Sequence, residues 1–377
     1  MERIWLSSPH MGENERKYVA EAFETNWIAP LGPNVDSFEL QIAKFLDVKS
    51  VLALNSGTAA LHLALQILGV RKGDIVICQS LTFAATAFPI SYCSGVPVFI
   101  DSEIDTWNMD PVLLEEAIKR QMAKGKKPAA IIIVHLYGMP AKMDEVLEIA
   151  QRYEIPVIED AAEALGSTYK GKACGSLGNI AILSFNGNKI ITTSGGGAFT
   201  SNNENFVNKA RHFSAQAKEP APYYLHKEIG YNYRLSNVLA GIGRGQMEVL
   251  PQRVKRRREV FDCYKKELSG IPGINFLPEP QDVFSNRWLT TIIINSDIMG
   301  SNITERIRLY LEKQNIESRN LWKPLHQQPV FAGYEVYNNG VADSLFANGL
   351  CLPSGSNLSD ENLNRVIYEI KNCINEN

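Results

Sequence analysis

The chain has 377 residues, of which 45% are hydrophobic and 21% are charged, a composition typical of a globular protein with one large core and room for a smaller domain. Its formal net charge of −3 gives no overall field that would attract nucleic acid or an acidic membrane. The six cysteines have no C-x-x-C spacing, the N-terminus has no long apolar signal region, and no apolar run approaches the roughly 20 residues of a membrane span. We therefore expect a cytoplasmic protein with reduced thiols, without a metal site or a disulfide framework.

Strand-like and helix-like segments alternate through the first two thirds of the chain. Helical spacing covers 13–26, 58–68 and 143–152, and Asp110-Pro111 places an N-cap and a first-turn proline at the start of another helix. Apolar runs typical of buried strands lie between the helices, at 51–54, 75–78, 96–101, 130–134, 156–160 and 181–185. Buried strands separated by helices predict an α/β fold with a mostly parallel, doubly wound sheet covered on both faces.

The pattern changes after about residue 236. A long helical stretch continues to about 268, strand signals follow at 288–294, and helices are predicted at 303–314 and 360–372. These elements predict a smaller α+β domain. We therefore divide the chain into a large domain at 1–245, which includes the N-terminal arm, and a small C-terminal domain at 246–377.

Two polar segments follow predicted strands and are candidates for ligand binding. Asn55-Ser56-Gly57-Thr58 leads from a strand into a helix, and such a turn exposes N–H groups that can cradle a phosphate, although an ordinary turn capped by Ser or Thr has the same pattern. Asp160 ends a buried strand, where an acid points into the crevice that binds ligands in α/β sheets, although a helix N-cap is the alternative.

Two further segments complete the set of candidates. A predicted strand ends at Phe185, a polar loop then presents Lys189, and a glycine-rich turn follows at 195–197. A lone lysine in a loop is usually a surface residue, and only the surrounding pattern argues against that here. The segment 230–236 is aromatic, polar and basic, and it immediately precedes the long helix.

In their order and spacing these segments resemble the sugar aminotransferases of the DegT/DnrJ/EryC1/StrS family, which are fold-type I enzymes that use pyridoxal phosphate (PLP). The resemblance runs from Asn26-Trp27-Ile28 to 351–355 and so covers nearly the whole chain. It implies that Lys189 forms the Schiff base with the cofactor and that Asp160 pairs with the pyridinium nitrogen. The other residues that it places at the cofactor are Ser56, Gly57, Thr58, Phe83, Glu163, Ser184 and Asn232.

Three of these residues have particular implied roles. Phe83 stacks on the cofactor ring, and Asn232 reaches a phosphate from the neighbouring subunit, which implies a homodimer with shared active sites. Glu163 stands where many relatives have glutamine, near the phenolic oxygen of the cofactor. A glutamate there either adds a negative charge or is held protonated by its surroundings.

The lysine at position 189 also indicates the type of reaction. A few family members have histidine there and act as dehydratases, so Lys189 favours transamination, with glutamate as the expected amino donor and the lysine amine as general base and acid. A PLP-dependent sugar dehydratase remains the alternative of another class. Retention of Lys189, Asp160 and Ser184 argues against a non-catalytic binding protein, and the absence of G-x-G-x-x-G from the first strand–helix turn argues against a nicotinamide dehydrogenase.

The segment 317–329 combines aromatic, cationic and amide side chains, which suit a sugar nucleotide, although a loop that holds the two domains together is the alternative. The resemblance places this segment and the loop at 25–32 at the sugar. The substrate candidates are Trp27, Ile28, Arg234, Trp322, Lys323 and His326. Arg234 is equally compatible with pairing to an acid in the core.

The segments 8–11, 26–34 and 322–329 look closest to one branch of the family, which makes bacillosamine-type sugars. The resemblance then implies conversion of UDP-2-acetamido-4-keto-2,6-dideoxyglucose to UDP-2-acetamido-4-amino-2,4,6-trideoxyglucose. The alternative substrate is GDP-4-keto-6-deoxymannose, which would make the chain a GDP-perosamine synthase.

Overall fold

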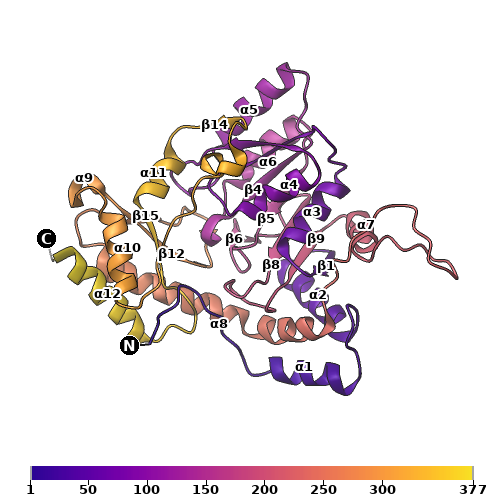
Figure 1. Ribbon diagram of the computed structural model, residues 1–377, viewed down its shortest axis with the longest axis horizontal. Coiled ribbons are helices and arrows are strands. Elements are labelled where there is room, and N and C mark those ends of the chain that lie inside the picture. Colours follow the sequence, from indigo (N-terminus) through magenta and orange to yellow (C-terminus); the bar gives the residue numbers. More distant parts are fainter. Residues whose placement is uncertain (1, 376–377) are drawn as a thin grey trace.

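The computed structural model describes residues 2–375, and within them eight strands form the main sheet (Figure 1). The strand order is β1-β9-β8-β5-β4-β2-β3-β14. The strands are β1 (Ser50–Leu54), β2 (Ile75–Gln79), β3 (Val96–Ile100), β4 (Ala130–Val134), β5 (Val157–Asp160), β8 (Ile180–Ser184), β9 (Gly197–Ser201) and β14 (Val336–Tyr337). Only β9 runs antiparallel to its neighbours, β1 and β8, so this described sheet is mostly parallel, as predicted.

Helices cover both faces of the sheet. Successive residues of each strand point to opposite sides, so apolar side chains lie on both faces and both need to be covered. Leu52 and Leu54 of β1 pack with α3 and α7, whereas Val51 and Ala53 pack with α2 and with α8 (Asn237–Leu268). Farther along the sheet, α5 and α6 cover the second face. The helices of this part are α1 (Glu15–Glu24), α2 (Pro33–Leu46), α3 (Gly57–Ile67), α4 (Phe88–Tyr92), α5 (Pro111–Ala123), α6 (Met143–Arg152) and α7 (Glu204–Ser214).

The C-terminal part builds a second core on a four-stranded antiparallel sheet, in the order β10-β12-β15-β13 within the described residues. Its strands are β10 (Ile274–Phe276), β12 (Thr290–Ile294), β13 (Arg319–Asn320) and β15 (Gly349–Leu352). Its helices are α9 (Ser296–Met299), α10 (Ile303–Lys313), α11 (Val341–Asn348) and α12 (Asp360–Asn375). Three short strands, β6 (Thr168–Tyr169), β7 (Lys172–Ala173) and β11 (Val283–Phe284), pair in a small separate sheet.

Three segments connect the two parts. Helix α8 (Asn237–Leu268) runs along the bottom of the molecule through the predicted boundary at 245/246 without a break (Figure 1). Near the N-terminus, Ile4 packs in the C-terminal core, where its backbone bridges Ile316. In the other direction, β14 leaves the C-terminal part and extends the main sheet beside β3. The division at 245/246 therefore stays a prediction.

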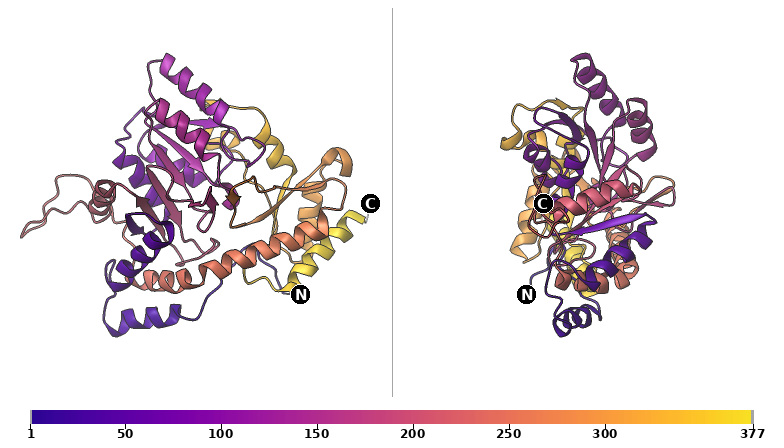
Figure 2. Two further views of the ribbon diagram at one scale, coloured as in Figure 1. Left: turned by 180° about the vertical axis from the view of Figure 1, so that it is seen from behind. Right: turned by 90° about the vertical axis from the view of Figure 1, so that its right-hand side faces the viewer.

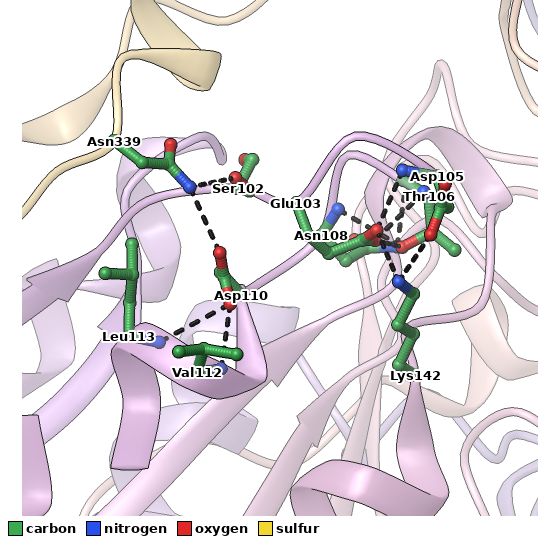
Figure 3. A network of polar contacts seen from close by, with 10 residues as sticks. All are labelled: Ser102, Glu103, Asp105, Thr106, Asn108, Asp110, Val112, Leu113, Lys142 and Asn339. Atoms are coloured by element: carbon green, nitrogen blue, oxygen red, sulfur yellow. Dashed lines mark hydrogen bonds and ion pairs between the residues drawn. The ribbon is translucent and has the colours of Figure 1, made fainter. Parts of the chain in front are cut away.

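Polar contacts fix the segment around β14 to the loop that follows β3 (Figure 3). The side-chain amide of Asn339 donates to the carbonyl oxygen of Ser102 and to Asp110, both at 3.1 Å. Lys142, directly before α6, forms an ion pair with Glu103 of this loop at 2.9 Å (Figure 3). The contacts of Asn339 attach the C-terminal chain to the edge of the main sheet.

A long loop after α7, residues 215–232, extends well away from the body of the molecule (Figures 1 and 2). An isolated antiparallel β-bridge between Lys218 and His226 joins its outgoing and returning segments. The large side chains of Tyr223, Tyr224 and Ile229 are 65%, 82% and 86% exposed. We call residues 215–232 the arm.

The helices and the cysteines bear on the expected environment of the chain. Within residues 2–375, the helices are all too short or too polar to cross a membrane. In the same range the cysteines form no disulfide, and most of them are buried. The cytoplasmic location stays a prediction.

Candidate active site

A cavity of about 380 Å³ lies at the carboxyl ends of the central parallel strands. Asp160 ends β5 and Ser184 ends β8, so the parallel pairing of these strands brings the two residues to the same edge of the sheet. The cavity brings together most of the predicted cofactor residues. Those in its wall are Ser56, Gly57, Thr58, Phe83, Asp160, Glu163, Ser184 and Lys189.

Asp160 is buried and held in a single orientation. Its Oδ2 accepts a hydrogen bond from the Thr86 hydroxyl at 2.7 Å, and its Oδ1 accepts from the N–H of Ala162 at 3.3 Å. Burial raises the pKa of Asp160, and these two donors together with the charge of Lys189 oppose that rise. A carboxylate fixed in this way can pair with a protonated ring nitrogen in the cavity.

Lys189 and Glu163 face each other across the cavity wall, with 3.4 Å between Nζ and Oε1. Their side chains are only 12% and 6% exposed. The other oxygen of Glu163 accepts the N–H of Tyr137 at 2.7 Å. Burial raises the pKa of Glu163, and the nearby Lys189 and the Tyr137 N–H limit the rise.

The opposite end of the cavity is the N-terminus of α3. Ser56 is its N-cap, and the Ser56 hydroxyl accepts the N–H of Ala59 at 3.0 Å, so the capping alternative is also correct. The first N–H groups of a helix have no partner within it and attract anions. A Cβ on Gly57 would lie 3.2 Å from the carbonyl oxygen of Leu183, so glycine lets the helix approach β8 closely.

These groups fit a cofactor with three functional parts. Lys189 supplies an amine for an aldehyde, Asp160 a fixed carboxylate for a ring nitrogen, and the α3 N-terminus with Ser184 donors for a phosphate. Phe83, which is 55% exposed at the cavity, supplies an aromatic face for the ring. The residues therefore fit pyridoxal phosphate.

The substrate candidates are more scattered, and among the described residues only Trp322 contributes to the cavity wall. Arg234 lies 3.8 Å from Glu39, which matches the alternative of pairing to an acid in the core. The two ring nitrogens of His326 contact the Ser80 hydroxyl at 2.7 Å and Asp343 at 3.0 Å, so His326 holds its loop against the end of β2.

The remaining candidates lie near the surface. Trp27 and Ile28 are 41% and 49% exposed, and Lys323 lies near the ring of Phe346. Asn232, at the base of the arm, has an exposed side chain, and its carbonyl oxygen accepts from Asn55 at 3.3 Å. Because Asn55 is part of the cavity wall, Asn232 lies next to the site but outside it.

Sequence reasoning missed several residues that shape the site. Thr86 holds Asp160, Asn188 and Trp288 contribute to the wall, and Tyr137 holds Glu163. Thr86 lies in the same short segment as Phe83, so that segment could have indicated it. Trp288 is 99 residues beyond Lys189 in the chain, and only the folded structure brings it to the site.

Comparisons with known proteins agree with this geometry. Residues 9–371 match the model of the DegT/DnrJ/EryC1/StrS aminotransferase family. EpsN from Bacillus subtilis, whose name assigns it as a pyridoxal phosphate-dependent aminotransferase, is 53% identical over 97% of this chain and 94% of its own. A GDP-perosamine synthase from Caulobacter vibrioides is 37% identical over 97% of this chain and 96% of its own.

A solved structure supports the same assignment. The PLP form of Spr1654 from Streptococcus pneumoniae, assigned as a sugar aminotransferase, has a TM-score of 0.91, is 28% identical and covers 99% of each chain. The chain therefore belongs to the DegT/DnrJ/EryC1/StrS aminotransferase family. The predictions of a fold-type I architecture, of an aminotransferase and of PLP as cofactor are confirmed.

We expect Glu163→Gln to raise the free energy of unfolding of the cofactor-free protein near neutral pH. Because the folded pKa of Glu163 is raised above its ordinary value of 4.5, its protonated form provides stability below about pH 4.5 that is lost as the pH rises through the folded pKa. Glutamine does not titrate, so the difference in free energy of unfolding between the variant and the native protein should grow as the pH rises from about 4.5 through the folded pKa of Glu163. Urea unfolding at several pH values measures it, with the exposed Glu145→Gln as control, and an advantage independent of pH would contradict the expectation.

Proposed function

We propose that this chain is a sugar aminotransferase that moves an amino group from glutamate to C4 of a nucleotide-linked 4-keto-6-deoxy sugar. The observation that carries the proposal is the cavity in which the Lys189 amine, the fixed carboxylate of Asp160 and the N-terminus of α3 meet. The sugar is supported by the relatives, which include a GDP-perosamine synthase and a dTDP-4-dehydro-2,3,6-trideoxy-D-glucose 4-aminotransferase.

The proposed roles follow from the position of each group. PLP, when bound, supplies an electron sink that lets a C–H bond beside an amino group lose its proton. Asp160 keeps the ring nitrogen protonated, and Ser184 and the α3 N-terminus hold the phosphate. The amine of Lys189 would move the proton between the donor carbon and the C4′ carbon of the cofactor, as general base and then as general acid. Glu163, 3.4 Å from that amine, is the neighbouring charge that orients it.

For the nucleotide we propose UDP, on the sequence of 8–11, 26–34 and 322–329, with UDP-2-acetamido-4-keto-2,6-dideoxyglucose as the acceptor. GDP-4-keto-6-deoxymannose stands as the alternative, because the GDP-perosamine synthases of Caulobacter vibrioides and Escherichia coli O157:H7 are each 37% identical to this chain. Trp322 is the substrate candidate that lies in the cavity wall, and Lys323 follows it in the chain.

We also propose a homodimer in which each subunit completes the site of the other. Asn232 lies beside its own cavity with its side chain exposed, and the arm that ends at Asn232 extends away from the body (Figure 2). The apolar side chains on the arm, Tyr223, Tyr224 and Ile229, are more exposed than large apolar groups usually are on a single folded chain. A second copy of the chain would cover them.

Lys189→Ala should prevent covalent attachment of PLP and lower transamination by roughly 10²- to 10⁴-fold, the range that a positioned general base contributes. Borohydride reduction of the holoenzyme followed by peptide mass spectrometry should place the cofactor on Lys189. The exposed Lys172→Ala is the matched control and should leave both activity and labelling unchanged. Labelling of another lysine would contradict the assignment of Lys189.

The nucleotide can be decided by two successive half-reactions. Glutamate alone should bleach the visible absorbance of the bound cofactor, because the amino group is transferred to it. The UDP-linked keto sugar should then restore the absorbance, and release of the amino sugar is measured by mass spectrometry. Recovery with the GDP-linked sugar alone would reverse the choice of nucleotide, and absorbance that glutamate leaves unchanged would contradict an aminotransferase and favour the dehydratase.

Asn232→Ala should weaken PLP binding by roughly 10- to 150-fold if the partner subunit supplies a hydrogen bond to the phosphate, since bonds to charged groups are worth about 1.5–3 kcal/mol. The exposed Asn205→Ala in α7 serves as control. At a PLP concentration that leaves Asn232→Ala largely unloaded, mixing it with the inactive Lys189→Ala protein should recover activity, because one site of each mixed dimer then has both native residues. The absence of such recovery, with dimers shown to exchange, would contradict shared sites.

A further inference from the structure

The amine of Lys189 lies on an aromatic ring that belongs to a distant part of the chain. Its Nζ is 4.2 Å from the centroid of the Trp288 ring, well within the roughly 6 Å over which a cation and a ring attract each other. The other polar neighbour that the structure records for this amine is Glu163, at 3.4 Å, which is long for a charged hydrogen bond. The indole face is therefore a principal contact of the amine.

Trp288 is held rigidly in this position. The side chain is 1% exposed, its backbone N–H donates to Asn286 Oδ1 at 2.8 Å, and its carbonyl oxygen accepts from the buried Arg257. Its indole Nε1 donates to the carbonyl oxygen of Asn188 at 2.8 Å. Because Asn188 immediately precedes Lys189, the same indole fixes both the backbone of the loop and the end of the lysine side chain.

The Trp288 ring is also the first of a column of four aromatic rings that leads to the cavity wall. Tyr137 stacks with Trp288 at 6.3 Å and with Trp322 at 5.9 Å between ring centroids, and Trp322 lies 5.5 Å from Phe83. Tyr137 also donates its N–H to Glu163 and accepts the N–H of Trp322 at its hydroxyl. The column therefore links the ring under the amine to both the acid beside the amine and the aromatic wall of the cavity.

The turn that carries Tyr137 is itself fixed from the neighbouring loop. The side chain of Asn108 accepts the N–H of Leu136 and donates to the carbonyl oxygen of Met139, each at 2.9 Å. The side chain of Asn108 is anchored in turn by Thr106 (Figure 3). With Tyr137 held in this way, the Trp288 ring has packing partners that prevent it from turning away from Lys189.

We propose that Trp288 is a positioning residue for the reaction, whose indole face holds the amine of Lys189 in the charged form that it has after taking up a proton. This inference rests on the role proposed for Lys189. Transamination requires the lysine to leave the cofactor, act on a proton and return, and a free lysine chain has many rotamers from which to return. A fixed ring beneath the amine confines it to the neighbourhood of the reacting atoms.

A purely structural role for Trp288 leads to a different expectation. A tryptophan that only fills the space between the two parts of the molecule would affect stability alone when replaced. A ring that stabilises the charged amine also controls how readily that amine reacts with an outside reagent. The chemical reactivity of Lys189 therefore separates the two roles without relying on the activity of the loaded enzyme.

The test compares acetylation of Lys189 by acetic anhydride at fixed neutral pH in the cofactor-free protein, quantified by peptide mass spectrometry. Trp288→Leu removes the ring and should raise the rate roughly 5- to 30-fold, the range from an exposed to a desolvated cation–ring attraction. Trp288→Phe keeps a weaker ring and should raise the rate about twofold, which keeps the test informative if the leucine variant does not fold. Phe99→Leu removes another fully buried aromatic ring, in a core cluster that does not include Trp288, and is the control, with no expected change.

The kinetic counterpart is the half-reaction with glutamate. Trp288→Leu should lower its rate constant at saturating glutamate by a larger factor than it changes the glutamate concentration that gives half of that rate. Equal acetylation rates in the native protein and in the folded Trp288 variants would overturn the role of Trp288. Borohydride labelling of the same variants separates this outcome from a failure of the proposed function. A cofactor found on Lys189 with unchanged acetylation contradicts only the inference, whereas a cofactor found elsewhere contradicts the assignment of Lys189 itself.

Discussion

The parallel pairing of β5 with β8 is the constraint on which the rest of the site depends. It sets Asp160 opposite Ile182, so that Asp160, Ser184 and the loop bearing Lys189 meet at one edge of the sheet. Glu159, one residue earlier on β5, necessarily points to the opposite face. There it accepts hydrogen bonds from the N–H groups of Gly175, Leu177 and Gly178, which fixes the chain that leads into β8.

The partner of Glu159 on that face is His135, 2.9 Å away and fully buried. Burial alone would lower the pKa of His135, but Cys174 and Glu159 raise it to about 10. Two adjacent acids of one strand thus have separate tasks: Glu159 secures the register of the sheet, and Asp160 is available to the cavity. Loss of either side chain would leave the other one buried without its hydrogen-bond partner, which is costly in a protein interior.

The cavity contains two buried carboxyl groups and one amine, and this composition works against stability. Burial raises the pKa values of both Asp160 and Glu163, which means that the folded protein disfavours the charged forms that the chemistry uses. The donors around them, the Thr86 hydroxyl and the Tyr137 N–H, recover part of that cost. Such groups are characteristic of sites selected for chemistry.

The sequence predicted the elements whose signals are local. The strands at 130–134 and 156–160, the helix at 143–152, and the polar residues at strand ends all occur where their patterns placed them. Strand β9 was missed because Gly197-Ala198-Phe199-Thr200-Ser201 follows directly on a glycine-rich turn and gains its burial only by pairing between β1 and β8. The two-residue β14 has no pattern at all, because its partner β3 is more than 230 residues earlier.

The same distinction applies to the site. Lys189 and Asp160 carry signals because chemistry dictates their residue type and their place after a strand. Trp288 and Tyr137 carry none, because an aromatic residue in an apolar segment is most often part of a core and only long-range packing turns these two toward the cavity. Arg234 shows the reverse case, since a residue that suits a phosphate by its chemistry lies instead beside Glu39.

The cofactor end and the substrate end of this site differ in how complete they are within one chain. Nearly every predicted cofactor residue is in the cavity wall, whereas among the described residues only Trp322 of the substrate candidates is there. Trp27 and Ile28 are instead exposed, as are the apolar side chains on the arm. A single chain therefore contains nearly all of the predicted cofactor residues, and in the homodimer proposed above the exposed surfaces around Asn232 and the arm would face the second chain.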